Sequence, residues 1–295
     1  MSIESINSIK VLRKLINNHH DKLNSILVKL NTDRIRVKTS TRKISSTEAE
    51  LKKFPFDKII QNIFDINTDS SNMEKEDFYK KYITVLGNKD IVFYLTNGAN
   101  KALVSGGAGT NRAITNINTN FFNNLNKDNC IFSSEKYVQN TILNEEAQNI
   151  TKTNMLNNCK HPGSTYYVDI PNFKYKSKYN IRGVYHINGW NHKISNVEDE
   201  KDYKRLVTAY YIAIMDHFFK FILKDKISIL HLVQCPGEIF GGKEITAKIF
   251  KNTVYGYLFD NREKLKDLQF RISIDYETNE KFNYEDYKSY NDLKK

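Results

Sequence analysis

The chain has 295 residues, which is long enough for a real core. Its formal net charge of +11 at pH 7 is either a general solubilising charge or a sign of polyanionic partners. It has no apolar run of membrane-spanning length, and its start lacks a signal-peptide pattern, so we expect an intracellular, cytoplasmic or also nuclear, protein without a membrane partner. The cysteines Cys130, Cys159 and Cys235 are odd in number and widely spaced, which argues against a disulfide framework.

Residues 1–80 are predicted to form a mainly helical extension. Apolar residues recur at helical spacing over 6–30, and residues 47–50 have the form of a capping box. The helical pattern resumes over 59–64. Between these segments, the basic run 34–43 is either an edge strand with a charged outer face or a nucleic-acid contact.

The first segment of the main domain is a strand followed by a glycine-rich loop. Residues 91–95 have the β-branched and aromatic content of a buried strand. Glycines in the following loop supply the backbone freedom that close approach to a phosphate requires. They are Gly106, Gly107 and Gly109.

A helix that begins near Thr110 or Asn111 would point its free N–H groups and its positive dipole end at a diphosphate. At the strand end, the amides of Asn97 and Asn100 suit hydrogen bonds to ribose hydroxyls. The same residues also fit a strand, a turn and a helix that bind no ligand.

A second unit of strand, glycine loop and helix is predicted further along the chain. Residues 229–235 form an apolar strand that leads into Pro236–Gly242, and helical spacing continues over 245–250. Between the two units, a short strand at 183–188 precedes an amphipathic helix at 203–219. We divide the chain into the extension 1–80, a main domain 81–280 and a polar tail 281–295, which is a surface helix or partly disordered.

The cysteines and histidines are predicted to be structural. Cys235 ends the second strand and has no base near it in sequence, so we expect a small buried side chain rather than a nucleophile. We expect His186 and His231 to be core residues. Although Cys159 and His161 lie close together, a metal site needs two further ligands, so we expect neither a metal nor a cofactor.

In order and character these segments resemble the macro domain family over roughly residues 82–275. The family has a strand-end Asn-Ala-Ala-Asn with a Gly-Gly-Gly loop, a His-x-x-Gly-Pro strand, a Leu-x-x-Ala-Tyr helix, and a second phosphate loop that ends Gly-Ile-Phe/Tyr-Gly. In the same order, this chain has Asn97–Asn100 with Gly106–Gly109, His186–Trp190, Leu206–Tyr210 and Glu238–Gly241.

The resemblance implies an α/β protein with a three-layer α/β/α macro-like fold, a mixed sheet, and an ADP-ribose cleft at the strand ends. It places Asn100 on the distal ribose, with Phe240 covering that ribose. The two glycine loops would line the two sides of the diphosphate. The implied ligand-binding residues are Asn97, Asn100, Gly106, Gly107, Ala108, Gly109, Pro236, Gly237, Glu238, Ile239, Phe240 and Gly241.

The chain departs from the family at its polar positions. Where hydrolytic members often carry an Asp that positions a water, this chain has Thr110 and Asn111, and neither can act as a general base. The resemblance leaves Asn100, Thr110 and Asn111 as the candidate catalytic residues. The family's adenine-recognising Asp is matched by Asn88 or Asp90.

The implied function is binding of ADP-ribose or ADP-ribosylated groups, with hydrolysis of an ADP-ribosyl ester or of ADP-ribose phosphate if the site is catalytic. One alternative is a non-enzymatic module that binds RNA, poly(A) or poly-ADP-ribose. Another is a degenerate interaction scaffold from a virus or another pathogen. Ser105, Ala108 and Glu238, at family loop positions, favour the scaffold.

Overall fold

Two units of the chain, Met1–Lys53 and Phe54–Lys295, are distinguished in the computed structural model and are described separately. In the first unit, residues 46–53 are helical, and Glu48 and Lys52 form an ion pair of 2.8 Å one turn apart. The structure describes residues 46–61, 91–100, 103–107, 109–134, 163–175, 179–188, 200–221, 227–235, 244–274 and 281–295.

The second unit is built on a mixed β-sheet. Within the described residues, the strand order is β1-β8-β7-β2-β6-β4-β3, and β5 pairs with β6 beside this path. The strands from β1 to β6 along this order run parallel, whereas β4 and β5 are antiparallel to β6, and β3 is antiparallel to β4. The strands are β1 Ile60–Gln61, β2 Ile91–Ala99, β3 Cys130–Phe132, β4 Thr165–Asp169, β5 Lys174–Tyr175, β6 Tyr179–Asn188, β7 Ile227–Leu232 and β8 Phe270–Ile274.

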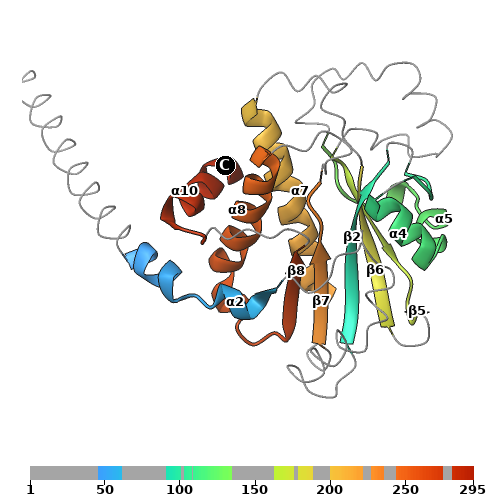
Figure 1. The fold of residues 1–295 in the computed structure, drawn as a ribbon, viewed down its shortest axis with the longest axis horizontal. Helices are drawn as coiled ribbons and strands as arrows, with labels where there is room; N and C mark the ends of the chain where they lie inside the picture. The colour runs from blue at the N-terminus through green and yellow to red at the C-terminus, as the bar shows by residue number, and fades with distance from the viewer. Residues whose placement is uncertain are drawn as a thin grey trace, which may run out of the picture. The chain divides into compact units, whose positions relative to one another are not determined.

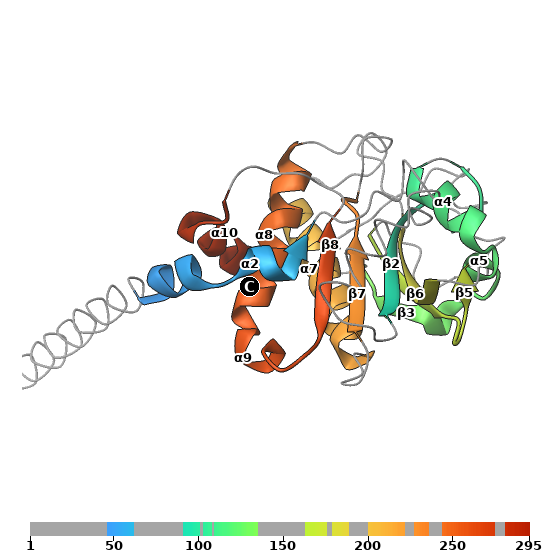
Figure 2. The same ribbon diagram turned by 60° about the horizontal axis from the view of Figure 1, so that its bottom comes forward.

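Helices cover both faces of this sheet (Figures 1 and 2). The long helices α7 and α8 pack on one face together with α10, and α4 and α5 pack on the other. The predicted three-layer α/β/α architecture with a mixed sheet is therefore confirmed. The helices are α2 Phe56–Ile59, α4 Gly109–Ile117, α5 Asn120–Asn123, a 3-10 turn at Lys127–Asn129, α7 Glu200–Phe221, α8 Glu244–Asp260, α9 Arg262–Leu265 and α10 Tyr284–Lys294.

The central strand β2 is apolar without interruption because both of its faces are covered. Val92 and Tyr94 pack into the core under α7 and α8, whereas Ile91, Phe93 and Leu95 pack into the core under α4 and α5. A parallel strand covered on both faces buries every side chain, so it lacks the alternation of a half-exposed strand. The predicted amphipathic stripe of α7 is also confirmed, since the stripe residues Leu206, Val207, Tyr210, Tyr211, Ile214, Met215 and Phe218 are buried.

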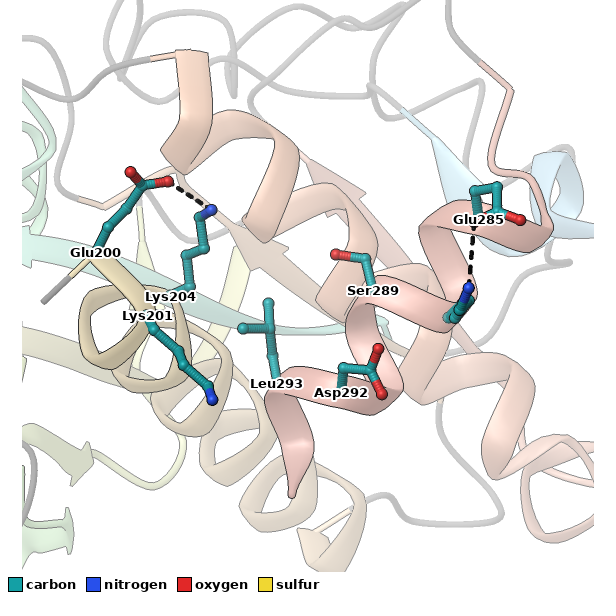
Figure 3. A pocket seen from close by; sticks show the side chains of 8 residues that line it. Glu200, Lys201, Lys204, Glu285, Ser289, Asp292 and Leu293 are labelled. Carbon is teal, nitrogen blue, oxygen red and sulfur yellow. Dashed lines mark ion pairs between the residues drawn. The ribbon is translucent and has the colours of Figure 1, made fainter.

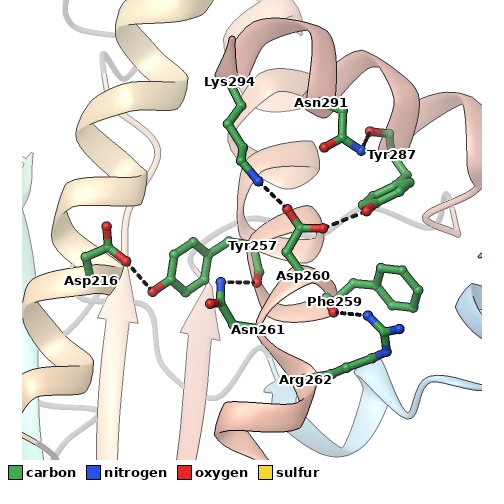
Figure 4. Close-up of polar contacts among 9 residues, drawn as sticks. All are labelled: Asp216, Tyr257, Phe259, Asp260, Asn261, Arg262, Tyr287, Asn291 and Lys294. Carbon is green, nitrogen blue, oxygen red and sulfur yellow. Dashed lines mark hydrogen bonds and ion pairs between the residues drawn. The ribbon is translucent and has the colours of Figure 1, made fainter.

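Helix α10, in the predicted polar tail, packs on α8. Tyr290 is 1% exposed, and its ring lies where Gly256 of α8 leaves space. Asp260 at the end of α8 accepts hydrogen bonds from the Tyr287 hydroxyl and the Lys294 ammonium group, each at 2.6 Å (Figure 4). Of the alternatives for this segment, the structure has the helix.

The helix predicted over 59–64 is wrong at its beginning. Helix α2 ends at Ile59, and Ile60 and Gln61 form the strand β1. Ile60 pairs with Ile272 of β8 and is 7% exposed, so burial in the sheet outweighs the local helical spacing. Residues 62–64 lie outside the described residues. Among the helices that the structure describes, none has the length and apolar character of a membrane span.

Candidate functional site

The last residues of β2 join neighbouring elements at the carboxyl end of the sheet. The Thr96 hydroxyl donates to the carbonyl of His231 in β7 at 3.0 Å and accepts from the N–H of Val233 at 2.8 Å. The N–H of Gly98 donates to the hydroxyl of Thr110 in α4 at 3.1 Å. Because β2, β6 and β7 are parallel, the loops that follow them meet at this edge, where open α/β sheets bind ligands.

Asn97 lies fully buried beneath the start of α4. Its Nδ2 donates to Asn111 Oδ1 at 2.9 Å and lies 3.0 Å from Nδ1 of His186. Burial lowers the pKa of His186 to about 3, and a hydrogen bond to the Phe121 backbone offsets only part of this. The neutral ring can therefore accept from Asn97 at Nδ1. Asn97 Oδ1 has no hydrogen-bond partner among the described residues.

The loop between β2 and α4 has the backbone that its glycines predict. The backbone φ values of Gly106, Gly107 and Gly109 are +95°, +81° and +58°, and residues with a Cβ rarely adopt such values. Helix α4 begins at Gly109, within one residue of the predicted start. The free N–H groups of its first turn lie at the same edge as the strand ends.

Two asparagines tether the loop to the body of the protein. Asn100 Nδ2 donates to the Val104 carbonyl at 2.9 Å, and Asn100 Oδ1 accepts from the Val104 N–H at 3.1 Å. Asn111 Nδ2 donates to the carbonyls of Val104 at 3.0 Å and Gly106 at 2.5 Å. Leu103 has a positive φ of +53° while its side chain is buried, so the turn before the glycines is held in a strained conformation.

The loop offers backbone dipoles rather than charged side chains. Over the described residues 103–107 and 109–112, Arg112 is the one ionisable side chain, and it is exposed. No carboxylate lies in these ranges that could activate a water. Among the described residues there is also no cluster of three or more His, Cys, Asp or Glu side chains that could hold a metal ion.

The end of β7 is held by two buried tyrosines of α7. The Tyr211 hydroxyl donates to the Val233 carbonyl at 2.7 Å and accepts from the Cys235 N–H at 2.8 Å. The Tyr210 hydroxyl donates to the Cys235 carbonyl. Burial raises the pKa of the Cys235 thiol to about 12, so it is a neutral, buried side chain as predicted. His186 and His231 are buried in the core, also as predicted.

The structure brings one half of the predicted site together. Asn97, Asn100, Gly106, Gly107, Gly109, Thr110 and Asn111 all lie at the end of β2, in the loop, or in the first turn of α4. The predicted site residues Asn88, Asp90, Ala108, Pro236, Gly237, Glu238, Ile239, Phe240 and Gly241 lie outside the described residues.

The two candidates for positioning a water, Thr110 and Asn111, are both hydrogen-bonded within the protein. Asn111 is 2% exposed, and its amide oxygen and nitrogen are both hydrogen-bonded within the protein. Thr110 is 9% exposed, and its hydroxyl accepts from Gly98. Thr110 therefore holds the start of α4 on β2, and Asn111 holds the loop carbonyls.

Sequence reasoning missed the side chains that hold the loops. Thr115 accepts the Gly106 N–H at 2.7 Å and donates to the Asn111 carbonyl at 2.7 Å. Its position one helical turn after Asn111 was the available signal. Nothing in the apolar stripe of α7 indicates that the hydroxyls of Tyr210 and Tyr211 reach the end of β7.

A separate open groove of about 560 Å³ lies between the first turn of α7 and helix α10 (Figure 3). Four of its charged side chains form ion pairs within a helix, Glu200 with Lys204 at 2.5 Å and Glu285 with Lys288 at 3.9 Å. Because these charges neutralise one another and side chains this exposed are screened by water, we do not assign a ligand to this groove.

No family model matches the chain, and no curated protein matches it. Among solved structures, the chain is similar to a macrodomain mutant of Oceanobacillus iheyensis with ADPR, at 15% sequence identity. The match covers 70% of this chain and 94% of that chain, with a TM-score of 0.36. A TM-score this low carries no argument about ligand or family, so the α/β/α fold class depends on the strand order and helix layers described above.

Proposed function

We propose that the chain binds ADP-ribose, or a group that carries ADP-ribose, at the loop between β2 and α4. The observation that carries this proposal is a glycine loop held in one conformation at the carboxyl end of the central strand. Its exposed backbone and the start of α4 offer N–H groups to a diphosphate. The order of the sequence motifs supports ADP-ribose over other diphosphates.

Asn100 is the proposed contact to the distal ribose. One hydrogen of its Nδ2 and one lone pair of its Oδ1 are used by the Val104 backbone. An amide has a second hydrogen and a second lone pair, so Asn100 still offers one donor and one acceptor to a sugar hydroxyl. A side chain already fixed in place loses little conformational entropy when the ligand binds.

We propose binding without a side-chain base. Thr110 and Asn111 are engaged within the protein, and the described loop has no carboxylate. Hydrolysis of an ADP-ribosyl ester or of ADP-ribose phosphate would need a water held by the ligand's own phosphate and by loop N–H groups. A recognition role asks less of these residues than a catalytic role does.

The net charge of +11 favours a second candidate, binding of RNA, poly(A) or poly-ADP-ribose. Such binding gains free energy from counterion release, so it weakens steeply as salt rises. Binding in a neutral loop through fixed N–H groups depends less on salt. Salt dependence therefore separates the two candidates.

The test is isothermal titration of the purified full chain with ADP-ribose, with ADP and with a short oligo(A), at matched low and high salt. We expect micromolar binding of ADP-ribose, about tenfold tighter than ADP, which corresponds to about 1.4 kcal/mol from the distal ribose. Salt-sensitive binding of oligo(A) without heat from ADP-ribose would instead assign the chain to the polyanion-binding class.

A further inference from the structure

Asn111 is buried, and its amide connects three separate backbone segments. It is 2% exposed, and its Oδ1 accepts from Asn97 at the end of β2. Its Nδ2 donates to the carbonyls of Val104 and Gly106 in the loop. Asparagine suits this place because one short side chain presents an acceptor on one atom and two donors on the other.

These bonds fix which way the loop's peptide groups face. In a trans peptide the C=O and the following N–H point in opposite directions. Because the Val104 and Gly106 carbonyls point at Asn111, the N–H groups of Ser105 and Gly107 point away from it. Ser105 and Gly107 are both exposed, and neither N–H donates a hydrogen bond to a described residue.

Thr115 fixes the peptide between these two. The Gly106 N–H donates to the Thr115 hydroxyl at 2.7 Å, and that hydroxyl donates to the Asn111 carbonyl at 2.7 Å. Loop N–H groups thus alternate between inward at Gly106 and outward at Ser105 and Gly107. Gly106 and Gly107 both have positive φ, so the peptide groups of this turn can adopt orientations that residues with a Cβ rarely reach. Backbone N–H groups that face the same side of a turn can form a concave anion site.

We propose that Asn111 is the positioning residue of this loop: it turns the N–H groups of Ser105 and Gly107 outward before any ligand arrives, and so it sets the affinity for a diphosphate without touching it. This inference depends on the proposed ADP-ribose function for its ligand. Asn97, buried beneath it and bonded to both Asn111 and His186, anchors Asn111 to the sheet.

The test variant is Asn111→Asp, which keeps the size of the side chain and removes both donors to the loop carbonyls. Losing two hydrogen bonds worth about 1 kcal/mol each weakens ADP-ribose binding roughly 30-fold. Because the new carboxylate also repels a diphosphate, the uncharged variant Thr115→Val is titrated beside it and should weaken binding without any added charge. The matched control is Asn252→Asp in α8, which makes the same change at an asparagine that is also 2% exposed. We expect the control to change affinity less than about threefold, whatever its melting temperature.

A local spectroscopic readout separates positioning from general stability. The Gly106 N–H is hydrogen-bonded to Thr115, so we expect slow amide hydrogen exchange at Gly106. In Asn111→Asp we expect it to exchange at least about tenfold faster, with the NMR signals of 105–107 shifted, while those of α8 keep their positions. Should Asn111→Asp fail to fold, Thr115→Val removes the acceptor for Gly106 and tests the same arrangement.

The outcomes are distinct. Wild-type affinity in Asn111→Asp, or unchanged exchange at Gly106, would overturn the positioning role. If the wild-type chain binds no ADP-ribose, the proposed function fails, and the exchange measurement still decides whether Asn111 orders the loop. The inference is supported only if Asn111→Asp shows both weaker ADP-ribose binding and faster amide exchange at Gly106, and the control Asn252→Asp shows neither.

Discussion

The side chains beneath the glycine loop are buried and uncharged. Burial lowers the pKa of His186 to about 3 and raises that of Cys235 to about 12, so both groups are neutral over the physiological range. Because these side chains are neutral, the field on the proposed anion would come from backbone N–H groups and the start of α4. Such fixed dipoles need no reorganisation when the anion binds.

His217 in α7 makes a residue-scale prediction about pH. Burial, with a smaller contribution from Lys220, lowers the pKa of His217 to about 4, and Nδ1 lies 3.2 Å from the Tyr185 hydroxyl. Between about pH 4 and pH 6.5, His217 binds more protons in the unfolded chain, where its pKa is near 6.5, than in the folded protein. The contribution of the neutral His217 to the free energy of unfolding is therefore fully present above about pH 6.5 and is lost as the pH falls toward 4.

Thermal unfolding of the wild type and of His217→Gln between pH 7 and pH 4 checks this. Glutamine can still hydrogen-bond to Tyr185 but does not titrate, so we expect the melting temperature of the variant to fall less steeply with pH. His186 still titrates, so part of the slope stays. Equal slopes for the two proteins would contradict the account of His217.

At the scale of elements, α8 and α10 meet through a glycine. A Cβ on Gly256 would lie 2.3 Å from Cδ1 of Tyr290, whose ring is almost fully buried. Alanine improves helix propensity by about 1 kcal/mol, but forcing a packed ring aside costs about 1–3 kcal/mol. We expect Gly256→Ala to be destabilising by about 1 kcal/mol in urea unfolding.

A double-mutant cycle identifies the cause. In a Tyr290→Ala background the ring is gone, so Gly256→Ala should become neutral or stabilising. If Gly256→Ala destabilises both backgrounds equally, the contact with Tyr290 is not the reason for the glycine.

Elements with strong local signals could be predicted from the sequence, and those set by distant partners could not. The strand at 91–95, the stripe of α7 and the start of α4 are local patterns, and the structure has all three. The strand at Ile60 is absent from the prediction because its partner Ile272 is far away in the sequence. Helical spacing at 59–64 favoured the local alternative.

In the candidate site, too, the features with a local signal could be predicted and those that depend on distant partners could not. The clustered glycines predicted the position of the loop, because few residues other than glycine adopt the positive φ values found there. The roles of Asn111 and Thr115 depend on which carbonyls lie within reach, and composition cannot show this. The role of Asn111 as a catalytic candidate stays a prediction, but the sequence could not show the hydrogen bonds of Asn111 to the loop.

At the scale of the whole molecule, charge and site act separately. The chain carries +11, whereas the described loop has Arg112 as its one ionisable side chain. Net charge attracts polyanions to the surface at long range, but it does not distinguish one phosphate ligand from another. The proposed selectivity for ADP-ribose therefore depends on the loop and the strand ends.

We propose that the backbone around Gly107 contacts the diphosphate, and titration of Gly107→Asp and Gly107→Asn with ADP-ribose tests this most directly. Both residues are tolerated at positive φ and have the same size, so the pair differs in charge and in the two donors of the amide. We expect Gly107→Asn to bind within about tenfold of the wild type and Gly107→Asp to lose a further factor of roughly 30, because a carboxylate next to a diphosphate is repelled. Equal affinity of the two variants for ADP-ribose would show that the diphosphate lies elsewhere.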